Sequence, residues 1–93
     1  MVDVRVPAPL RVHTQGEKLV QGDGSTIGEL LADLDRRYPG IRTGLFDPSS
    51  GELRRFVNVY VNDEDIRYLG RMEATVQPGD TVSILPAVAG GAH

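Results

Sequence analysis

The chain has 93 residues, a length that fits one domain with one hydrophobic core. It contains no cysteine, which excludes disulfides, thiolate metal sites and a thiol nucleophile. The net charge of −3 argues against a nucleic-acid partner, and no apolar run approaches the ~20 residues of a membrane span. The first residues lack the charged start and apolar centre of a signal peptide, so we expect a cytoplasmic protein.

Two short strands are expected in the first quarter of the chain. In Val2–Val6, three valines alternate with polar residues, which is the period of a half-buried strand. Pro7 and Pro9 limit this strand because proline donates no hydrogen bond to a sheet. The second strand is expected over Lys18–Gln21, and the preceding Gln15-Gly16 pair is expected to turn the chain into a hairpin.

One long helix is expected to begin after Thr26. Thr26 lies three residues before Glu29, which is the spacing of a capping box. The Gly22-x-Gly24 pattern before it lacks the further glycine or lysine of phosphate-binding loops, so we interpret it as a turn. Pro39-Gly40 is expected to end the helix. The apolar residues between these limits form one helical stripe, namely Ile27, Leu30, Leu31, Leu34 and Tyr38.

The second half of the chain shows a strand-rich pattern. Ile41–Phe46 is expected to form a turn or a 3₁₀ segment, and Asn62–Asp65 a polar turn. Strands are expected over Phe56–Val61, over Ile66–Leu69 as a short edge strand, and over Thr81–Leu85. The order of these elements predicts an α+β fold with a sheet of about five strands around one main helix.

The sequence offers no pattern that is typical of a catalytic or metal centre. Asp63, Glu64 and Asp65 are consecutive, so their side chains diverge, unlike the alternating ligands of a calcium loop. His13 and His93 are the only histidines, whereas zinc needs three or four ligands. No serine lies in a nucleophile-elbow pattern. We therefore expect a protein that is not an enzyme and that uses no metal or other cofactor.

The C-terminal segment carries the strongest functional signal. After the last expected strand, an uncharged stretch leads to Gly90-Gly91. Glycine has no side chain, so another backbone can approach it closely, and the six steps from Leu85 to Gly91 span about 20 Å when extended. A carboxylate on Gly91 can therefore enter a narrow site of a partner, be adenylated there, and become a thiocarboxylate when sulfide displaces AMP. The competing interpretation is a frayed, glycine-rich end.

Together, these features resemble the ubiquitin-like β-grasp sulfur carriers of the ThiS/MoaD group, with the actinobacterial carriers of cysteine synthesis as the nearest branch. The resemblance covers essentially the whole chain and is carried by Asp47–Gly51, Arg55–Asp65 and Gly79–Gly91. It implies a β-grasp domain over residues 1–86 and a flexible tail over residues 87–93. It also implies that Gly90 and Gly91 form the site of adenylation and thiocarboxylate formation.

The resemblance implies partners as well. An ATP-dependent adenylyltransferase/sulfurtransferase would activate Gly91, and a biosynthetic enzyme for cysteine, molybdopterin, thiamine or a sulfur-containing natural product would accept the sulfur. The chain continues with Ala92-His93. Either a JAMM-type metallopeptidase cleaves between Gly91 and Ala92, or the two residues are a remnant of cloning. Two alternatives stay open: a modifier conjugated to lysines, and a non-catalytic β-grasp interaction subunit.

A partner-binding surface is expected on the open face of the sheet. Val57, Val59 and Val61 are the more apolar set of their strand, and we expect them to face the helix. The competing interpretation is that the aromatic residues of the opposite face only stabilise their cross-strand neighbours. The surface and the start of the tail would together contact partners through Phe56, Tyr60, Leu85, Pro86, Ala87, Val88 and Ala89.

Overall fold

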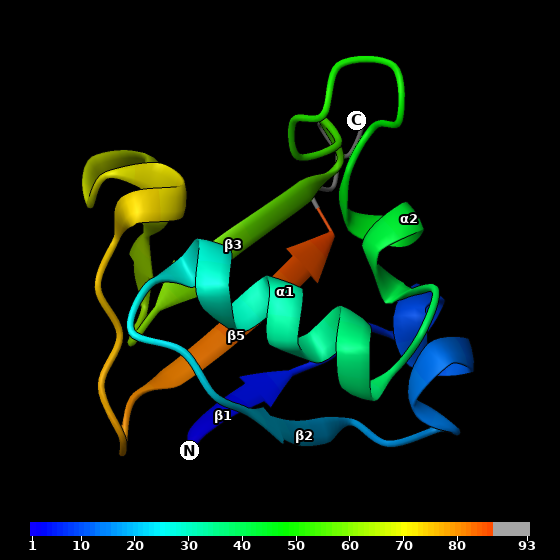
Figure 1. The fold of residues 1–93 in the computed structure, drawn as a ribbon, viewed down its shortest axis with the longest axis horizontal. Helices are drawn as coiled ribbons and strands as arrows, with labels where there is room; N and C mark the ends of the chain where they lie inside the picture. Colours follow the sequence, from blue (N-terminus) through cyan, green and yellow to red (C-terminus); the bar gives the residue numbers. More distant parts are fainter. Residues whose placement is uncertain (87–93) are drawn as a thin grey trace.

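One long helix lies across one face of a five-stranded sheet (Figure 1). The computed structural model describes residues 1–86. The strands follow the order β2-β1-β5-β3-β4, with β1 and β5 parallel and the other neighbours antiparallel. The expected α+β fold with a mixed sheet of about five strands is confirmed. The strands are β1 (Val2–Arg5), β2 (Leu19–Gly22), β3 (Val57–Val61), β4 (Glu64–Asp65) and β5 (Thr81–Pro86).

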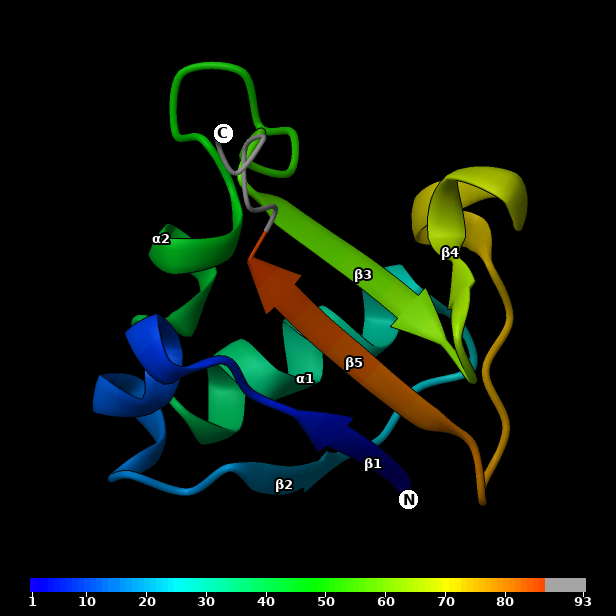
Figure 2. The same cartoon turned by 180° about the vertical axis from the view of Figure 1, so that it is seen from behind.

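Two α-helices and three 3₁₀ helices connect the strands. The long helix α1 covers one face of the sheet, which we call the inner face. Seen from behind, the sheet lies in front of α1 and its outer face points toward the viewer (Figure 2). Within residues 1–86, no helix is both long enough and apolar enough to cross a membrane. The helices are η1 (Ala8–Thr14), α1 (Ile27–Arg37), α2 (Ile41–Leu45), η2 (Ile66–Tyr68) and η3 (Arg71–Glu73).

The start of α1 is held by the expected capping box and by a second segment. The Glu29 N–H donates to Thr26 Oγ1 at 3.2 Å, and the Glu29 carboxylate accepts from the Ser25 N–H at 2.9 Å. The Ile27 N–H donates to the carbonyl of Ala74 at 2.9 Å. The first turn of α1 is therefore fastened both to its own cap and to the chain that leads into β5.

The core lies between α1 and the inner face of the sheet. The apolar stripe of α1 is buried as expected, and so are the inward residues of the two central strands. On β3, Val59 and Val61 face this core, whereas Val57 is half-buried. The side chains with the least exposure include Val4, Ile27, Leu30, Leu34, Val82 and Ile84.

The connection between the first two strands differs from the expected tight turn. β1 and β2 pair antiparallel, as expected for a hairpin, but η1 lies between them. Pro7 precedes this 3₁₀ helix and Pro9 lies in its first turn, where proline loses no hydrogen bond. Gln15 ends it with a positive φ of 57°. Leu10 and Thr14 are buried, so the connection adds to the core.

The predicted edge strand at Ile66–Leu69 is wrong. Asn62 and Asp63 adopt positive φ angles and form a tight turn, so the chain pairs with β3 immediately afterwards, at Glu64–Asp65. The Asp65 carboxylate then accepts the Arg67 N–H at 2.9 Å and starts η2. Ile66 is buried from this 3₁₀ helix. The pattern of polar and apolar residues over Ile66–Leu69 does not by itself distinguish an edge strand from a 3₁₀ helix.

The segment after α1 also differs from its prediction. Instead of a turn or 3₁₀ segment over Ile41–Phe46, the structure has the short α-helix α2. Gly40 precedes it with φ 99°, a conformation that favours glycine. Ile41 and Leu45 are fully buried at i and i+4, so packing against the core stabilises a helix that is too short to persist alone.

A buried carboxylate anchors the second half of α1. Asp33 is not a member of the apolar stripe, yet it is only 7% exposed. Its carboxylate accepts the Asp23 N–H at 2.8 Å and the Arg37 Nε–H at 2.6 Å, and it also pairs with Arg36. A buried charge needs such partners. The network ties α1 to the loop that follows β2.

Gly24 allows that loop to pass close to α1. A Cβ atom at this position would lie 2.5 Å from the Leu30 nitrogen and 2.9 Å from the Glu29 carbonyl carbon. Both are backbone atoms of a helix and cannot move away independently. The glycine pattern interpreted as a turn therefore has a steric reason.

We predict that Gly24→Ala lowers the free energy of unfolding by about 1–3 kcal/mol, because the added methyl group overlaps the backbone of α1. Urea denaturation followed by circular dichroism measures this change. Ser25→Ala is the matched control, since it keeps the Ser25 N–H that Glu29 accepts. Equal stability of the Gly24 variant and wild type would contradict the close approach.

We predict that Asp33→Ala lowers the free energy of unfolding by about 2 kcal/mol, because it leaves the Asp23 N–H and the Arg37 Nε–H without their acceptor. The exposed Arg36 is the control, and Arg36→Ala should cost less than about 1 kcal/mol. Denaturant melts of both variants test the order. Similar losses in the two variants would show that the network acts only as a surface ion pair.

Candidate functional site

The last strand determines where the chain leaves the folded domain. β5 lies between β1 and β3, and its final residue, Pro86, is paired with Val57. The parallel pairing with β1 ends earlier, at Arg5 and Ser83. The tail therefore starts from the middle of the sheet, beside β3. The expected site residues Ala87, Val88, Ala89, Gly90, Gly91 and Ala92 lie outside the described residues.

The register of the sheet places four outward-facing side chains in one row, one each from β3, β5, β1 and β2. On the outer face, Tyr60 lies opposite Ser83, and Ser83 lies opposite Arg5. Arg5 in turn lies opposite Leu19. Leu85 follows Ser83 by two residues and faces the same way. We call these five residues, Arg5, Leu19, Tyr60, Ser83 and Leu85, the tail-root surface.

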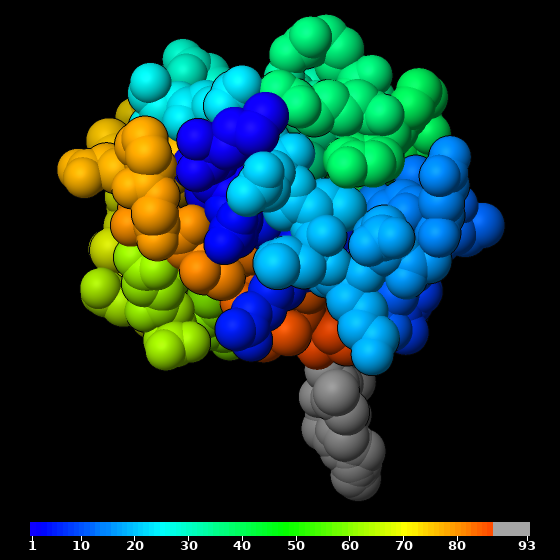
Figure 3. Space-filling model, turned by 90° about the horizontal axis from the view of Figure 1, so that it is seen from below, coloured from blue at the N-terminus to red at the C-terminus, as the bar shows by residue number. Residues whose placement is uncertain are grey.

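The apolar part of the tail-root surface is open to solvent. Leu85 is 46% exposed and Leu19 is 52% exposed, whereas Tyr60 is half-buried. An open groove beside them is lined by Arg5–Pro9, Arg11, Lys18, Leu19 and Ile84–Pro86. Figure 3 shows the orange-red end of β5 next to the blue N-terminal segments on this side. An apolar groove with a basic rim thus adjoins the point where the tail begins.

Phe56 occupies a different position from the one predicted. It lies in a turn one residue before β3, so strand alternation does not determine which way it points. Its ring is 56% exposed, and the Arg54 guanidinium lies 5.9 Å from the ring centroid. Phe56 is therefore an exposed aromatic residue of the loop, while Tyr60 and Leu85 are the members of the expected set that β-sheet register places on one face.

The charge beside Tyr60 is already compensated. Asp65 of β4 lies opposite Tyr60, and its carboxylate accepts three hydrogen bonds from the Arg67 side chain, at 3.2 Å to one oxygen and at 2.7 and 3.1 Å to the other. The hydrogen bonds from Arg67 hold the pKa of Asp65 below its ordinary value. This end of the outer face therefore adds no unpaired acid to the tail-root surface.

The described residues contain no arrangement for metal binding. Within residues 1–86, no group of three or more histidine, cysteine, aspartate or glutamate side chains could hold a metal ion. The acidic triplet at 63–65 is divided between a tight turn and β4. What this part of the chain offers is a binding surface at the base of a tail.

Sequence reasoning missed the contribution of the first two strands to this surface. Arg5 lies opposite Leu19 of β2 on one side and Ser83 of β5 on the other, and only the register of the sheet brings these three residues together. The available signal was the alternation around Val20, which is buried and so leaves Leu19 outward. The parallel pairing of β1 with β5, however, has no local signature.

Comparisons with known proteins agree with this geometry. The ThiS family profile matches residues 4–91, which is nearly the whole chain. The sulfur carrier protein CysO of Mycobacterium tuberculosis is 53% identical over 91 residues, covering 97% of this chain and 98% of that protein. The small archaeal modifier protein 3 of Haloferax volcanii is 36% identical over 69 residues, covering 74% of this chain and 73% of that protein.

Solved structures show the same fold. The crystal structure of Mycobacterium tuberculosis CysO superposes with a TM-score of 0.90 at 50% identity, covering 95% of this chain and all of that one. CysO from the Amycolatopsis orientalis BexX/CysO complex superposes with a TM-score of 0.88 at 50% identity, covering 98% and 100%. The fold is thus the ubiquitin-like β-grasp, and the chain belongs to the ThiS family.

Proposed function

We propose that this protein is a sulfur carrier whose Gly91 carboxylate is adenylated by a partner and converted into a thiocarboxylate. The observation that carries the proposal is the match of the ThiS family profile, which runs from residue 4 to Gly91 and so ends on the diglycine. The 53% identity to a sulfur carrier protein supports the same role. In this role the chain is a substrate of other enzymes and not itself an enzyme.

The chemistry requires a reactive carboxyl end and a partner that supplies the energy. The Gly91 carboxylate attacks the α-phosphorus of ATP, which forms an acyl-adenylate and releases pyrophosphate. Sulfide then attacks the acyl carbon and displaces AMP, leaving a C–S bond at Gly91. No side chain at Gly90 or Gly91 obstructs a narrow active site. A biosynthetic enzyme accepts the sulfur from this thiocarboxylate.

The structure supports a division of the chain into a docking domain and a reactive tail. Residues 1–86 form the β-grasp domain, and the five steps from Pro86 to Gly91 span at most about 17 Å. The tail-root surface would hold the domain against the activating enzyme while residues 87–91 enter its active site. A CysO protein has been solved in complex with BexX, so a relative of this chain forms a complex with another protein.

Ala92-His93 must be absent for this chemistry, because a thiocarboxylate on Gly91 requires a free carboxyl group there. We propose removal by a JAMM-type metallopeptidase that cleaves between Gly91 and Ala92. The cytoplasm is the compartment in which ATP and the partner enzymes would meet the carrier.

We predict that the chain trimmed to Gly91 gains the mass of one sulfur for one oxygen after incubation with a ThiS-type activating enzyme, ATP and sulfide. The 93-residue form should stay unmodified, because its terminal carboxylate lies on His93. Intact-mass spectrometry measures both. A thiocarboxylate on His93 would contradict the proposal, and a protein-sized adduct would indicate a modifier instead.

In the trimmed chain, Gly91→Ala is the control for the narrow site, since it keeps the carboxylate and adds one methyl group. It should block thiocarboxylate formation without lowering the melting temperature. Normal activation of this variant would show that the partner does not require a terminal glycine.

We predict that Tyr60→Ala and Leu85→Ala each weaken binding to the activating enzyme by more than about 1 kcal/mol, because both side chains would be buried in the interface. Isothermal titration calorimetry with the trimmed chain measures the affinity.

Tyr68→Ala and Leu69→Ala are the matched controls for this prediction. Tyr68 is 84% exposed and Leu69 is 37% exposed, and both lie at η2, away from the tail-root surface. Unchanged affinity in both test variants, with the fold intact, would exclude the tail-root surface as the docking site.

A further inference from the structure

A second cavity lies beside β3 and plays no part in the proposed transfer of sulfur. It has a volume of about 420 Å³ and lies between the loop at 51–55 and the 3₁₀ segments η2 and η3. This volume falls within the range of about 300–1,000 Å³ that is usual for small-molecule sites. The apolar side chains that line it are Phe46, Leu53, Val57, Val59, Ile66 and Met72.

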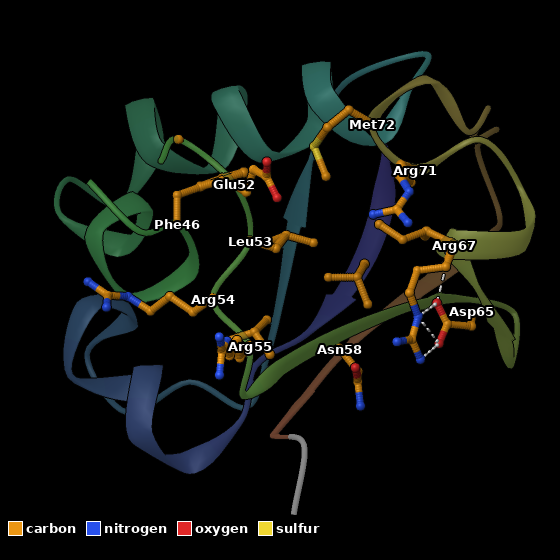
Figure 4. Close-up of a pocket in the computed structure, with 14 residues that line it drawn as sticks. Phe46, Glu52, Leu53, Arg54, Arg55, Asn58, Asp65, Arg67, Arg71 and Met72 are labelled. Carbon is orange, nitrogen blue, oxygen red and sulfur yellow. Dashed lines mark hydrogen bonds and ion pairs between the residues drawn. The ribbon is translucent and has the colours of Figure 1, made fainter. Parts of the chain in front are cut away.

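Four arginines surround this apolar lining. Figure 4 shows Arg67 and Arg71 on the side of η2 and η3, and Arg54 and Arg55 on the opposite side, with Leu53 between the two pairs. The side chain of Asn58 points away from the cavity in the same view. We call this space the arginine cavity. Its rim is cationic although the whole chain carries a net charge of −3.

The carboxylates at the arginine cavity do not balance these charges. Asp65 pairs with Arg67 at 2.7 Å, so one acid neutralises one arginine. Glu52 is the other acidic residue of the lining. Among residues 1–86, no carboxylate lies within ion-pair distance of Arg54, Arg55 or Arg71.

The structural duties of the arginines differ. Arg54 donates from Nε to the carbonyl of Thr43 at 2.9 Å, which holds its loop in place. In residues 1–86, the side chains of Arg55 and Arg71 make no hydrogen bond or ion pair, and both residues are exposed. Two guanidinium groups beside an apolar lining are therefore available to an external anion.

We infer that the arginine cavity binds a small organic anion, in which a carboxylate, phosphate or sulfonate group is attached to an apolar body. The apolar body packs on Leu53, Val57 and Met72, the charged group accepts hydrogen bonds from Arg71, and Arg55 on the opposite side of the cavity adds to the positive potential. Guanidinium groups bind such anions through paired N–H donors, and the apolar lining selects against bare inorganic ions. The residues that line the cavity all lie between Phe46 and Met72 in the sequence, and binding of an anion there requires no activation of the tail, so the inference does not depend on the proposed function.

A titration of the isotope-labelled protein with 4-phenylbutyrate tests this inference without any activating enzyme. The backbone amides of Leu53, Val57, Val59 and Met72 should shift and reach saturation in ¹H–¹⁵N correlation spectra. Neutral 4-phenylbutyramide and acetate, which lack the charge and the apolar body respectively, should bind much more weakly. Equal affinity for the amide, or shifts confined to other parts of the chain, would overturn the inference.

Charge variants provide the second arm of the experiment. Arg55→Gln and Arg71→Gln should each weaken 4-phenylbutyrate binding about twofold to fivefold, and Glu52→Gln should strengthen it by a similar factor. Arg36→Gln, at an exposed arginine outside the arginine cavity, should have no effect. All of these positions are exposed, so the variants should fold. Unchanged affinity in both test arginine variants would also overturn the inference.

Discussion

Burial of the α1 stripe against the inner face of the sheet is the interaction on which the rest of this structure depends. Ile27, Leu30 and Leu34 have no exposed surface, and burial of each such side chain is worth about 2 kcal/mol. These contacts are possible only if the first turn of α1 lies over η3 and its last turns lie over β2. The hydrogen bond from Ile27 to Ala74 and the Asp33 network hold these two ends.

This arrangement packs one face of the sheet into the core and leaves residues of the other face, such as Leu19 and Leu85, exposed to solvent. β5 carries both roles, because Val82 and Ile84 face α1 while Ser83 and Leu85 face outward. β5 pairs with β1 on one side and with β3 on the other, and the pairing with β1 ends at Ser83. A tail that starts here could enter a partner's active site without displacing the core, which suits the chemistry proposed for Gly91.

The arginines of the chain fall into two groups: some pair with acidic residues of the fold, and others stand at the surfaces described above. Arg36 and Arg37 compensate the buried Asp33, and Arg67 compensates Asp65. Arg5 stands on the tail-root surface, and Arg55 and Arg71 stand at the arginine cavity. An acidic protein thus presents local basic surfaces on two sides of β3 and β5, where an interface or an anion can use them.

The sequence by itself determined the elements whose cause is local: the capping box at Thr26, the stripe of α1, the alternating strands and the diglycine at residues 90–91. The ThiS-type resemblance rested on Asp47–Gly51, Arg55–Asp65 and Gly79–Gly91, and the family match confirmed it. Only the tertiary structure decided which side chains meet across distant strands, as Leu19, Arg5 and Tyr60 do through register. It also decided that Asp33 is buried and that Ile66 lies in a 3₁₀ helix. The physical reason is that strand register, burial of a charge and the shape of a cavity depend on contacts between residues far apart in the chain, whereas caps, turns and periodicity depend on neighbours within a few residues.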